Sequence, residues 1–296
     1  MALARPTLGL FLALALGLPA GAAAQADPFN FPFTSGQTVA PFFDGWSRNP
    51  DGTYEMHFGY INRNYVEELH VPLGPDNSFD TGGVDQGQPT FFYPRVHRKV
   101  FSVTVPADWG GRELVWSLTV HGQRQQAIAW LDPVWEIEPI LGGRAPTPEQ
   151  RINQAPLLSV TADGRTVSLP DTLALTARVS DDGVPRASGP RRRARGQETP
   201  PTLQPAADEP RAPVNVPVLR TGVRPSEVAV DDRLTITWSV LRGPASVAVE
   251  ADSDDPDARA PVPMTATFSA PGEYLLRASL SDGHLTDMTE LEVRVE

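Results

Sequence analysis

Apolar and polar residues alternate with a period of two along much of this chain. In the first half the alternation recurs at 54–60, 101–105 and 114–120. An extended strand sends successive side chains to opposite faces, so each of these segments has one apolar face and one polar face. Turn sequences such as NPDG at 49–52 separate the segments. No stretch of ten or more residues in this half has convincing helical periodicity. The pattern predicts an all-β fold, a sandwich or a barrel.

The alternation stops and then returns. Residues 132–156 hold five prolines and a Gly-Gly pair with little periodicity. Strand patterns resume after them, at 173–179, 234–240, 264–268, 274–280 and 291–295. The sequence therefore predicts two β-sandwich domains, an N-terminal one at 27–140 and a second at 157–296, joined by a Pro-rich linker at 141–156.

The second half carries a recognisable set of short motifs. They are NQAP at 153–156, Leu169-Pro170, SDDG at 180–183, Trp238 with Gly243-Pro244, the segment from Phe268 to Tyr274, and SDG at 281–283. In this order they resemble the bacterial polycystic-kidney-disease-like (PKD-like) repeat, which has an immunoglobulin (Ig) fold. The resemblance implies a small β-sandwich that serves as a spacer or protein-interaction module in secreted and surface proteins and is not itself an enzyme.

The chain departs from that family between Gly183 and Trp238, where its connection is much longer than the corresponding connection in PKD-like domains. Residues 187–224 are rich in Pro and Arg and lack apolar periodicity. Such a tract buries too little apolar surface to offset its ordering entropy, so a disordered loop is predicted. The basic run Arg191–Arg195 within it has three interpretations: a solvated linker, an electrostatic tether to anionic envelope polymers or to the acidic body of the chain, and a protease site.

The N-terminal half has a resemblance of its own. Residues 40–77, APFFDGWSRNPDGTYEMHFGYINRNYVEELHVPLGPDN, are similar to a segment of uncharacterised secreted bacterial proteins. That resemblance implies no activity.

The first 26 residues have the pattern of a signal peptide. Arg5 precedes an apolar run at 8–18, and small residues follow as far as Ala26. We expect cleavage and a secreted or periplasmic protein that does not span a membrane afterwards; the alternative is an uncleaved N-terminal anchor. The sequence has no cysteine, so it lacks the lipobox cysteine of a bacterial lipoprotein.

The composition argues against several functional classes. The absence of cysteine excludes disulfides, thiol nucleophiles and Cys-ligated zinc. The net charge is -11, and the basic residues gather in the predicted loop rather than on a folded surface, which is unlike a nucleic-acid-binding protein. No nucleophile elbow, zinc-binding His-Glu-x-x-His helix or phosphate loop occurs. We therefore predict no catalytic, cofactor-binding or metal-binding residues.

Three groups of residues keep alternative hypotheses open. The histidines, His57, His70, His97, His121 and His284, lack metal-ligand spacing, and His57 and His121 are expected to face solvent. The acidic run at 252–257 suits either calcium or a solvated loop, and Asp181, Asp182 and Asp282 would join it only if their loops share one end of the sandwich.

The third group is aromatic. Trp, Tyr and Phe crowd the first domain beside Asn62, Arg63 and Asn64, and aromatic rings next to polar side chains are typical of glycan sites. The rings are Trp46, Tyr60, Tyr65, Phe91, Phe92, Tyr93, Trp109, Trp130 and Trp135. Their burial in the core would remove this alternative.

The sequence thus favours a non-enzymatic interaction or spacer protein of the bacterial envelope, whose partner is a protein or an envelope polymer. A carbohydrate-binding module is the first alternative, and an enzyme with a site between the domains is the second.

Overall fold

The structure is a computed structural model that describes residues 33–137, 148–184, 224–231, 233–252 and 260–296. The predicted signal peptide, nearly all of the insertion at 187–224 and the acidic residues Asp254, Asp255 and Asp257 lie outside these ranges. Apart from one short α-helix and one 3-10 helix, the regular elements among the described residues are all strands, which confirms the all-β prediction.

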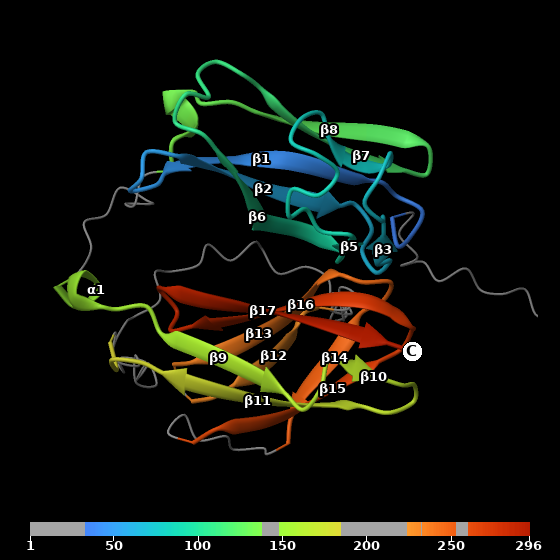
Figure 1. Ribbon diagram of the computed structural model, residues 1–296, viewed down its shortest axis with the longest axis vertical. Helices are drawn as coiled ribbons and strands as arrows, with labels where there is room; N and C mark the ends of the chain where they lie inside the picture. Colours follow the sequence, from blue (N-terminus) through green and yellow to red (C-terminus); the bar gives the residue numbers. More distant parts are fainter. Residues whose placement is uncertain (1–32, 138–147, 185–223, 232, 253–259) are drawn as a thin grey trace, which may run out of the picture. The chain divides into compact units, whose positions relative to one another are not determined.

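The N-terminal strands form two three-stranded antiparallel sheets (Figure 1). The first sheet has the order β1-β2-β6, with bounds Val39–Arg48, Tyr54–Asn62 and Arg95–Val105. The second has the order β4-β7-β8, with bounds Asn77–Phe79, Leu114–Val120 and Gln123–Ala129. A short ribbon pairs β3 (Leu69–His70) with β5 (Phe91–Phe92). A 3-10 helix, η1 (Pro133–Trp135), follows β8.

These two sheets pack face to face over an aromatic core. Phe58 of β2 and Phe101 of β6 approach Trp116 of β7, with ring centroids 6.0 and 4.9 Å from the Trp116 ring. All three side chains are buried. The alternation at 54–60, 101–105 and 114–120 therefore correctly identified three strands and their inward faces, as expected for a sandwich whose two inner faces interdigitate.

The C-terminal strands form a second sandwich of one four-stranded and one five-stranded sheet (Figure 1). The smaller sheet has the order β14-β15-β11-β9, with bounds Val247–Ala251, Val262–Phe268, Leu173–Ser180 and Leu157–Ala162. The larger has the order β10-β17-β16-β13-β12, with bounds Thr166–Val167, Thr286–Val295, Gly272–Ser281, Thr235–Arg242 and Ser226–Ala229. A single turn of helix, α1 (Pro148–Ile152), precedes β9.

This strand order is that of an immunoglobulin domain. The order β9-β11-β15-β14 corresponds to strands A, B, E and D, and β13-β16-β17 corresponds to C, F and G. Strand β12 is an addition: it comes before β13 in the chain and pairs with its free edge. The long connection at 185–223 therefore lies between the strands that correspond to B and C.

Two side chains support the Ig assignment. Trp238 of β13 is buried in the core, where Ig domains place a tryptophan of strand C. Tyr274, near the start of β16, donates its hydroxyl to the carbonyl of Ala270 at 2.8 Å. This is the geometry of the tyrosine corner of Ig sandwiches.

Candidate functional site: the seam between the sandwiches

Residues 85–100 and Glu68 of the N-terminal half lie against β13, the loop after β13 and β16 of the Ig sandwich, and we call this contact the seam. Phe91 and Tyr93 are buried in the same apolar cluster as the Ig core. The hydroxyl of Tyr93 accepts a hydrogen bond from the backbone N–H of Val240 at 3.0 Å. The backbone N–H of Thr90 donates to the carbonyl of Leu241, also at 3.0 Å. Burial of the Tyr93 hydroxyl raises its pKa to about 12, so it remains protonated at neutral pH.

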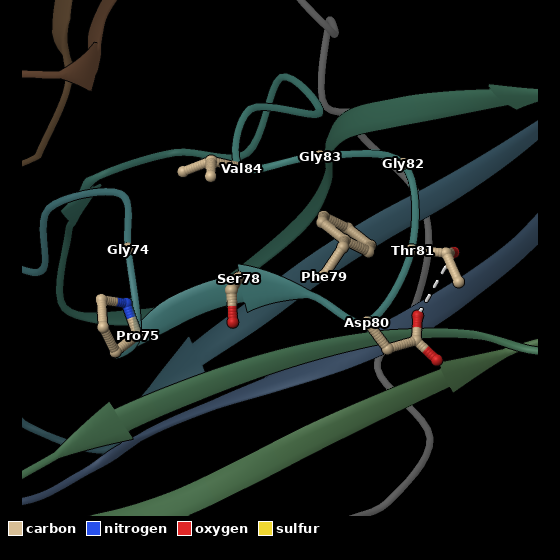
Figure 2. Close-up of a pocket in the computed structure, with 9 residues that line it drawn as sticks. All are labelled: Gly74, Pro75, Ser78, Phe79, Asp80, Thr81, Gly82, Gly83 and Val84. Carbon is tan, nitrogen blue, oxygen red and sulfur yellow. Dashed lines mark hydrogen bonds between the residues drawn. The ribbon is translucent and has the colours of Figure 1, made fainter.

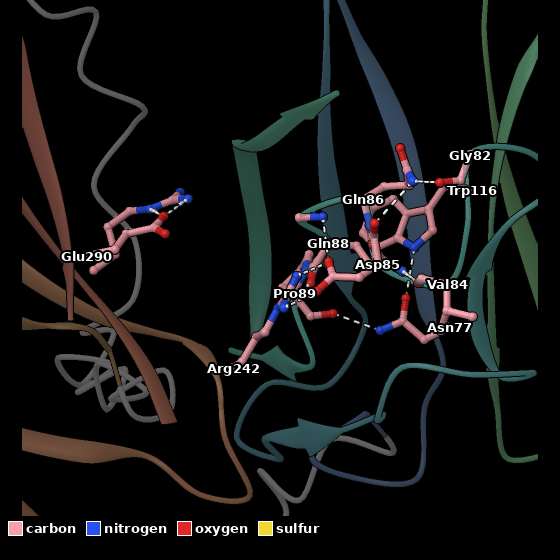
Figure 3. A network of polar contacts seen from close by, with 12 residues as sticks. Asn77, Gly82, Val84, Asp85, Gln86, Gln88, Pro89, Trp116, Arg242 and Glu290 are labelled. Carbon is pink, nitrogen blue, oxygen red and sulfur yellow. Dashed lines mark hydrogen bonds and ion pairs between the residues drawn. The ribbon is translucent and has the colours of Figure 1, made fainter. Parts of the chain in front are cut away.

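An ion pair closes one end of the seam (Figure 3). The guanidinium of Arg242, at the end of β13, binds both carboxylate oxygens of Asp85, at 2.8 and 2.5 Å. Its Nε also donates to the carbonyl of Gln88 at 3.1 Å. The hydrogen bond with Arg242 holds the pKa of Asp85 below its usual range. A two-point contact of this kind fixes orientation as well as position.

The segment that carries Asp85 is itself anchored in the N-terminal core, as Figure 3 shows. Asn77 of β4 is fully buried and donates to the carbonyls of Pro89 and Val71, at 2.7 and 3.0 Å. Its side-chain oxygen accepts from the indole N–H of Trp116 at 3.0 Å. Since buried polar groups cost free energy unless they are bonded, this network fixes residues 85–90 firmly enough to present a defined surface to β13.

A second arginine crosses the seam from β16. Arg277 bonds Glu290 of β17 through Nε and Nη2, at 3.0 and 2.6 Å. Its Nη1 donates to the carbonyl of Val100 in β6. Together with Arg242, Arg277 ties both ends of the 85–100 segment to the Ig sandwich.

The part of β6 that reaches Arg277 is bulged. The pairing of β2 with β6 shifts register between Phe58 and Tyr60, so β6 bends there. The carboxylate of Asp44 holds the bulge by accepting from the backbone N–H of Lys99 and from Nη1 of Arg98, both at 2.7 Å. Gly59 allows β6 to lie this close to β2, since a Cβ at position 59 would lie 2.5 Å from the carbonyl oxygen of His97.

One carboxyl group in the seam has an unmet hydrogen-bond requirement. Glu68 is half-buried beside Ser246, and its Oε1 has no hydrogen-bond partner. Burial raises the pKa of Glu68, and the hydrogen bond with Ser246 opposes that rise.

Most of the aromatic rings considered for glycan binding are buried. Trp46, Tyr60, Phe91, Phe92 and Tyr93 are at most 4% exposed, so they present no stacking face. Asn62 and Asn64 are also fully buried and bond to each other.

Trp135 is the most exposed of the remaining rings, at 42%. It meets Trp130 edge to face at an interplanar angle of 70°, and the two rings therefore do not form one flat platform.

The five histidines are dispersed over the fold. His121 and His284 are exposed, as is His70. His57 was expected to face solvent but is half-buried, and its ring forms a hydrogen bond with Ser47 at 2.8 Å. Burial lowers the pKa of His57. His97 stacks on the ring of Tyr60. Among the described residues no three His, Asp or Glu side chains are placed to hold a metal ion.

The acidic loops of the Ig sandwich do share one end. Asn153 bonds Asp282 at 2.8 Å, and the backbone N–H of Gln154 donates to Asp182 at 3.0 Å. Asp181 pairs with Arg233 at 2.7 Å. Protein donors thus already engage each of these carboxylates.

Asp252 follows β14 toward the same end and accepts from Thr265 at 2.8 Å. Buried oxygens of Asn153 and Asp181 lack hydrogen-bond partners, but without a group of three suitable ligands we assign no metal here.

A separate hollow lies on the N-terminal sandwich (Figure 2). It has a volume of about 460 Å³ and runs from Gly74 to Val84 along β4 and the loop after it. Phe79 and Val84 give it an apolar lining. The carboxylate of Asp80 is engaged with the backbone N–H of Val115 at 3.0 Å, so the hollow offers little polar recognition.

The pairings of the seam were not expected from the sequence. In the sequence Tyr93 is one of many aromatic residues of the first domain, and no motif distinguishes Asp85, Arg242 or Arg277. One feature of the sequence could have indicated a polar contact here. Arg242 directly follows the apolar residues of β13, at the end of the strand.

Fold and seam together define an all-β protein whose C-terminal sandwich is Ig-like and is bonded directly to the N-terminal strands. No protein-family model and no curated protein matches the sequence. No helix among the described residues has the length and apolar character needed to cross a membrane.

Several solved structures of Ig-like domains align with long parts of the chain at low similarity. The D00-D0 domain of Intimin aligns over 86% of this chain and 99% of its own, with a TM-score of 0.25 and 10% identity. The Yersinia pseudotuberculosis adhesin InvE aligns over 87% and 58%, with a TM-score of 0.23 and 10% identity. A chimeric titin Z1Z2 aligns over 88% and 99%, with a TM-score of 0.24 and 9% identity. Because these scores are low, the Ig assignment rests on strand order and on the tyrosine corner.

Proposed function

We propose that this chain is a non-enzymatic interaction or spacer protein of the bacterial envelope. In this proposal residues 1–26 are a cleaved signal, residues 27–140 and 157–296 are the two sandwiches, the second of them PKD-like, and residues 141–156 link them. The mature protein is secreted or periplasmic and binds a protein or an envelope polymer.

The observation that supports the proposal is the seam. Two sandwiches tied by Tyr93, Arg242 and Arg277 hold their surfaces at a defined spacing, which is what a spacer or a composite binding surface requires. An enzyme would need convergent acid, base or nucleophilic groups in a cleft. Among the residues that the structure describes, the lining of the seam cavity has His97, Lys99 and three serine or threonine side chains but no carboxylate, and the hollow in Figure 2 has Asp80 as its one carboxyl group.

The experiment is a binding assay with isolated envelope fractions. The chain from residue 27 would be mixed with peptidoglycan sacculi, outer-membrane vesicles and periplasmic extract, and binding would be measured by co-sedimentation and by affinity capture. A variant with Arg191, Arg192, Arg193 and Arg195 changed to Gln tests whether the basic run is the binding element.

We expect saturable binding to one fraction. If the Arg-to-Gln variant binds equally well, the folded sandwiches carry the interaction; if it loses binding, the basic run does. Absence of saturable binding to every fraction would contradict an interaction role.

A spacer role has its own measurement. Spin labels at exposed sites Arg124 of β8 and Arg178 of β11 should give one narrow distance distribution for the wild-type chain. A broad distribution would mean that the sandwiches are not held at a fixed spacing, and the spacer role would then fail.

A further inference from the structure

A cavity of about 220 Å³ lies in the seam, between the outer face of the sheet containing β13 and β16 and the bulged part of β6. Tyr60 and Tyr93 line it from the N-terminal side, together with the three consecutive residues His97, Arg98 and Lys99. Ligand pockets for drug-sized molecules measure roughly 300–1,000 Å³. This cavity therefore admits only a small molecule or one group of a larger one.

The wall formed by the Ig sandwich is polar. Thr237 and Ser239 of β13 and Ser279 of β16 all line the cavity. Thr237 is directly opposite Ser279 in the strand pairing, so their side chains are neighbours on the outer face of the sheet. None of the three hydroxyls bonds to another described residue, so each has a free donor and free acceptors.

The cavity is also positively charged. Arg98, Lys99 and Arg277 line it, and no acidic residue in the described part of the chain does. The charges of Arg98 and Arg277 are met by Asp44 and Glu290, in ion pairs of 2.7 and 2.6 Å. Lys99 makes no ion pair with any described residue.

Lys99 is the single lysine of the chain, which otherwise uses arginine for its basic side chains. A lysine ammonium is a compact charge with three donors, and it approaches an oxyanion without the fixed fork of arginine.

The backbone at Lys99 supports a functional role. Its φ angle is 49°, in the left-handed region that residues other than glycine seldom adopt. Such strained positions cluster at ligand sites, where the surrounding structure holds them. Here Asp44 supplies that support by accepting the Lys99 backbone N–H.

We propose that the seam cavity binds a small oxyanion, a phosphate or carboxylate group, between the ammonium of Lys99 and the hydroxyls of Thr237, Ser239 and Ser279. Because residues of both sandwiches would contact it, the bound anion would also stabilise the seam.

The first experiment uses the unique lysine as a reporter. The full chain is treated with an amine-acetylating reagent, and the rates at Lys99 and at the chain's amino terminus are compared by peptide mass spectrometry. Inorganic phosphate and succinate serve as probes, with sodium chloride at matched ionic strength as reference. We expect at least one probe to slow acetylation at Lys99 and to leave the amino terminus unchanged.

The second experiment measures affinity by isothermal titration with the same two probes. Lys99→Gln should weaken binding about tenfold or more, since it removes a charged hydrogen-bond donor. Thr237→Val, which exchanges a hydroxyl for a methyl group of similar size, should weaken it by a smaller factor. The matched controls are Arg178→Gln on β11 and Thr119→Val on β7, which remove one cation and one hydroxyl elsewhere and should leave affinity unchanged.

Three results would overturn the proposal. They are absence of binding by both probes, binding that Lys99→Gln leaves intact, and an equal loss in Arg178→Gln, which would indicate general electrostatic attraction. Circular dichroism of each variant verifies that it folds, and the acetylation test on the wild-type chain requires no variant at all.

Discussion

Single residues decide how polar groups are accommodated in the seam, and Glu68 is the clearest case. Its carboxyl is half-buried, one oxygen has no hydrogen-bond partner, and burial raises its pKa. The charged form is therefore less stable in the folded protein than in the unfolded chain. Asp85 is the opposite case, since its bond with Arg242 lowers its pKa and favours the charged form.

The change Glu68→Gln should raise the free energy of unfolding at pH 7. For a carboxyl whose folded pKa is raised, the favourable contribution is fully present below the unfolded pKa and is lost as pH rises through the folded pKa. The difference between variant and wild type should therefore disappear as the pH falls below about 4, near the ordinary pKa of glutamate. Urea denaturation at several pH values measures it.

Glu113→Gln, at an exposed position on the N-terminal sandwich, is the matched control and should leave the free energy of unfolding at pH 7 close to that of the wild type. A Glu68→Gln variant that is less stable than wild type at pH 7 would show that the carboxylate is favourably solvated in the seam.

At the scale of elements, the bulge in β6 determines what the N-terminal sandwich presents to the Ig sandwich. A regular strand would continue its alternation through 98–100, whereas the bulge brings the Val100 carbonyl to Arg277 of β16 and places Lys99 in the lining of the seam cavity. Gly59 on β2 makes the bulge possible, because the space of its missing side chain is filled by the His97 carbonyl and the Asp44 carboxylate.

Gly59→Ala should therefore destabilise the protein by about 1–3 kcal/mol, the usual cost of forcing an extra methyl group into a packed site. It should also shift the NMR signals of His97, Arg98 and Lys99 more than those of β7 and β8. Thermal denaturation and amide spectra measure the two effects.

Gly111→Ala is the control, because a Cβ at Gly111 meets no atom within 4 Å and its φ is not positive. Equal effects of the two substitutions would show that close packing at Gly59 does not hold the bulge.

At the scale of the whole molecule, residues 33–296 form one compact unit although they contain two sandwiches. The shared apolar cluster explains this, since Phe91 and Tyr93 come from the N-terminal half and are buried with the Ig core. Unfolding of either sandwich exposes part of the other. The two should therefore unfold together.

The double variant Tyr93→Phe/Arg242→Gln tests this coupling. Loss of the Tyr93 hydroxyl leaves the buried N–H of Val240 without its acceptor, at a cost of about 1–3 kcal/mol. We expect a single calorimetric transition for the wild-type chain and two separated transitions for the variant. Tyr54→Phe, whose hydroxyl makes only an exposed contact with Arg48, is the control. Two transitions in the wild-type chain would mean that the seam does not couple the sandwiches.

Much of the fold was predictable because its signals are local. The segments 173–179, 234–240 and 274–280 were expected as strands and are β11, β13 and β16. The turns and the tyrosine corner also depend on short motifs. The segment from Phe268 to Tyr274, for example, contains both residues of the tyrosine corner, Ala270 and Tyr274. The half-buried His57 was not expected, because its partner Ser47 lies on the neighbouring strand and alternation within one strand does not reveal it.

The sequence by itself determined the all-β class, the inward faces of the main strands and the Ig-like motifs, since strand periodicity and turn chemistry act over a few residues. Only the tertiary structure decided the seam, its cavity and the site of Lys99. Arg242 and Asp85 are 157 residues apart in the chain, and Arg277 and Val100 are 177 apart. No local pattern specifies such pairs, because they form only when a bulge in one sheet and the outer face of another are brought into contact.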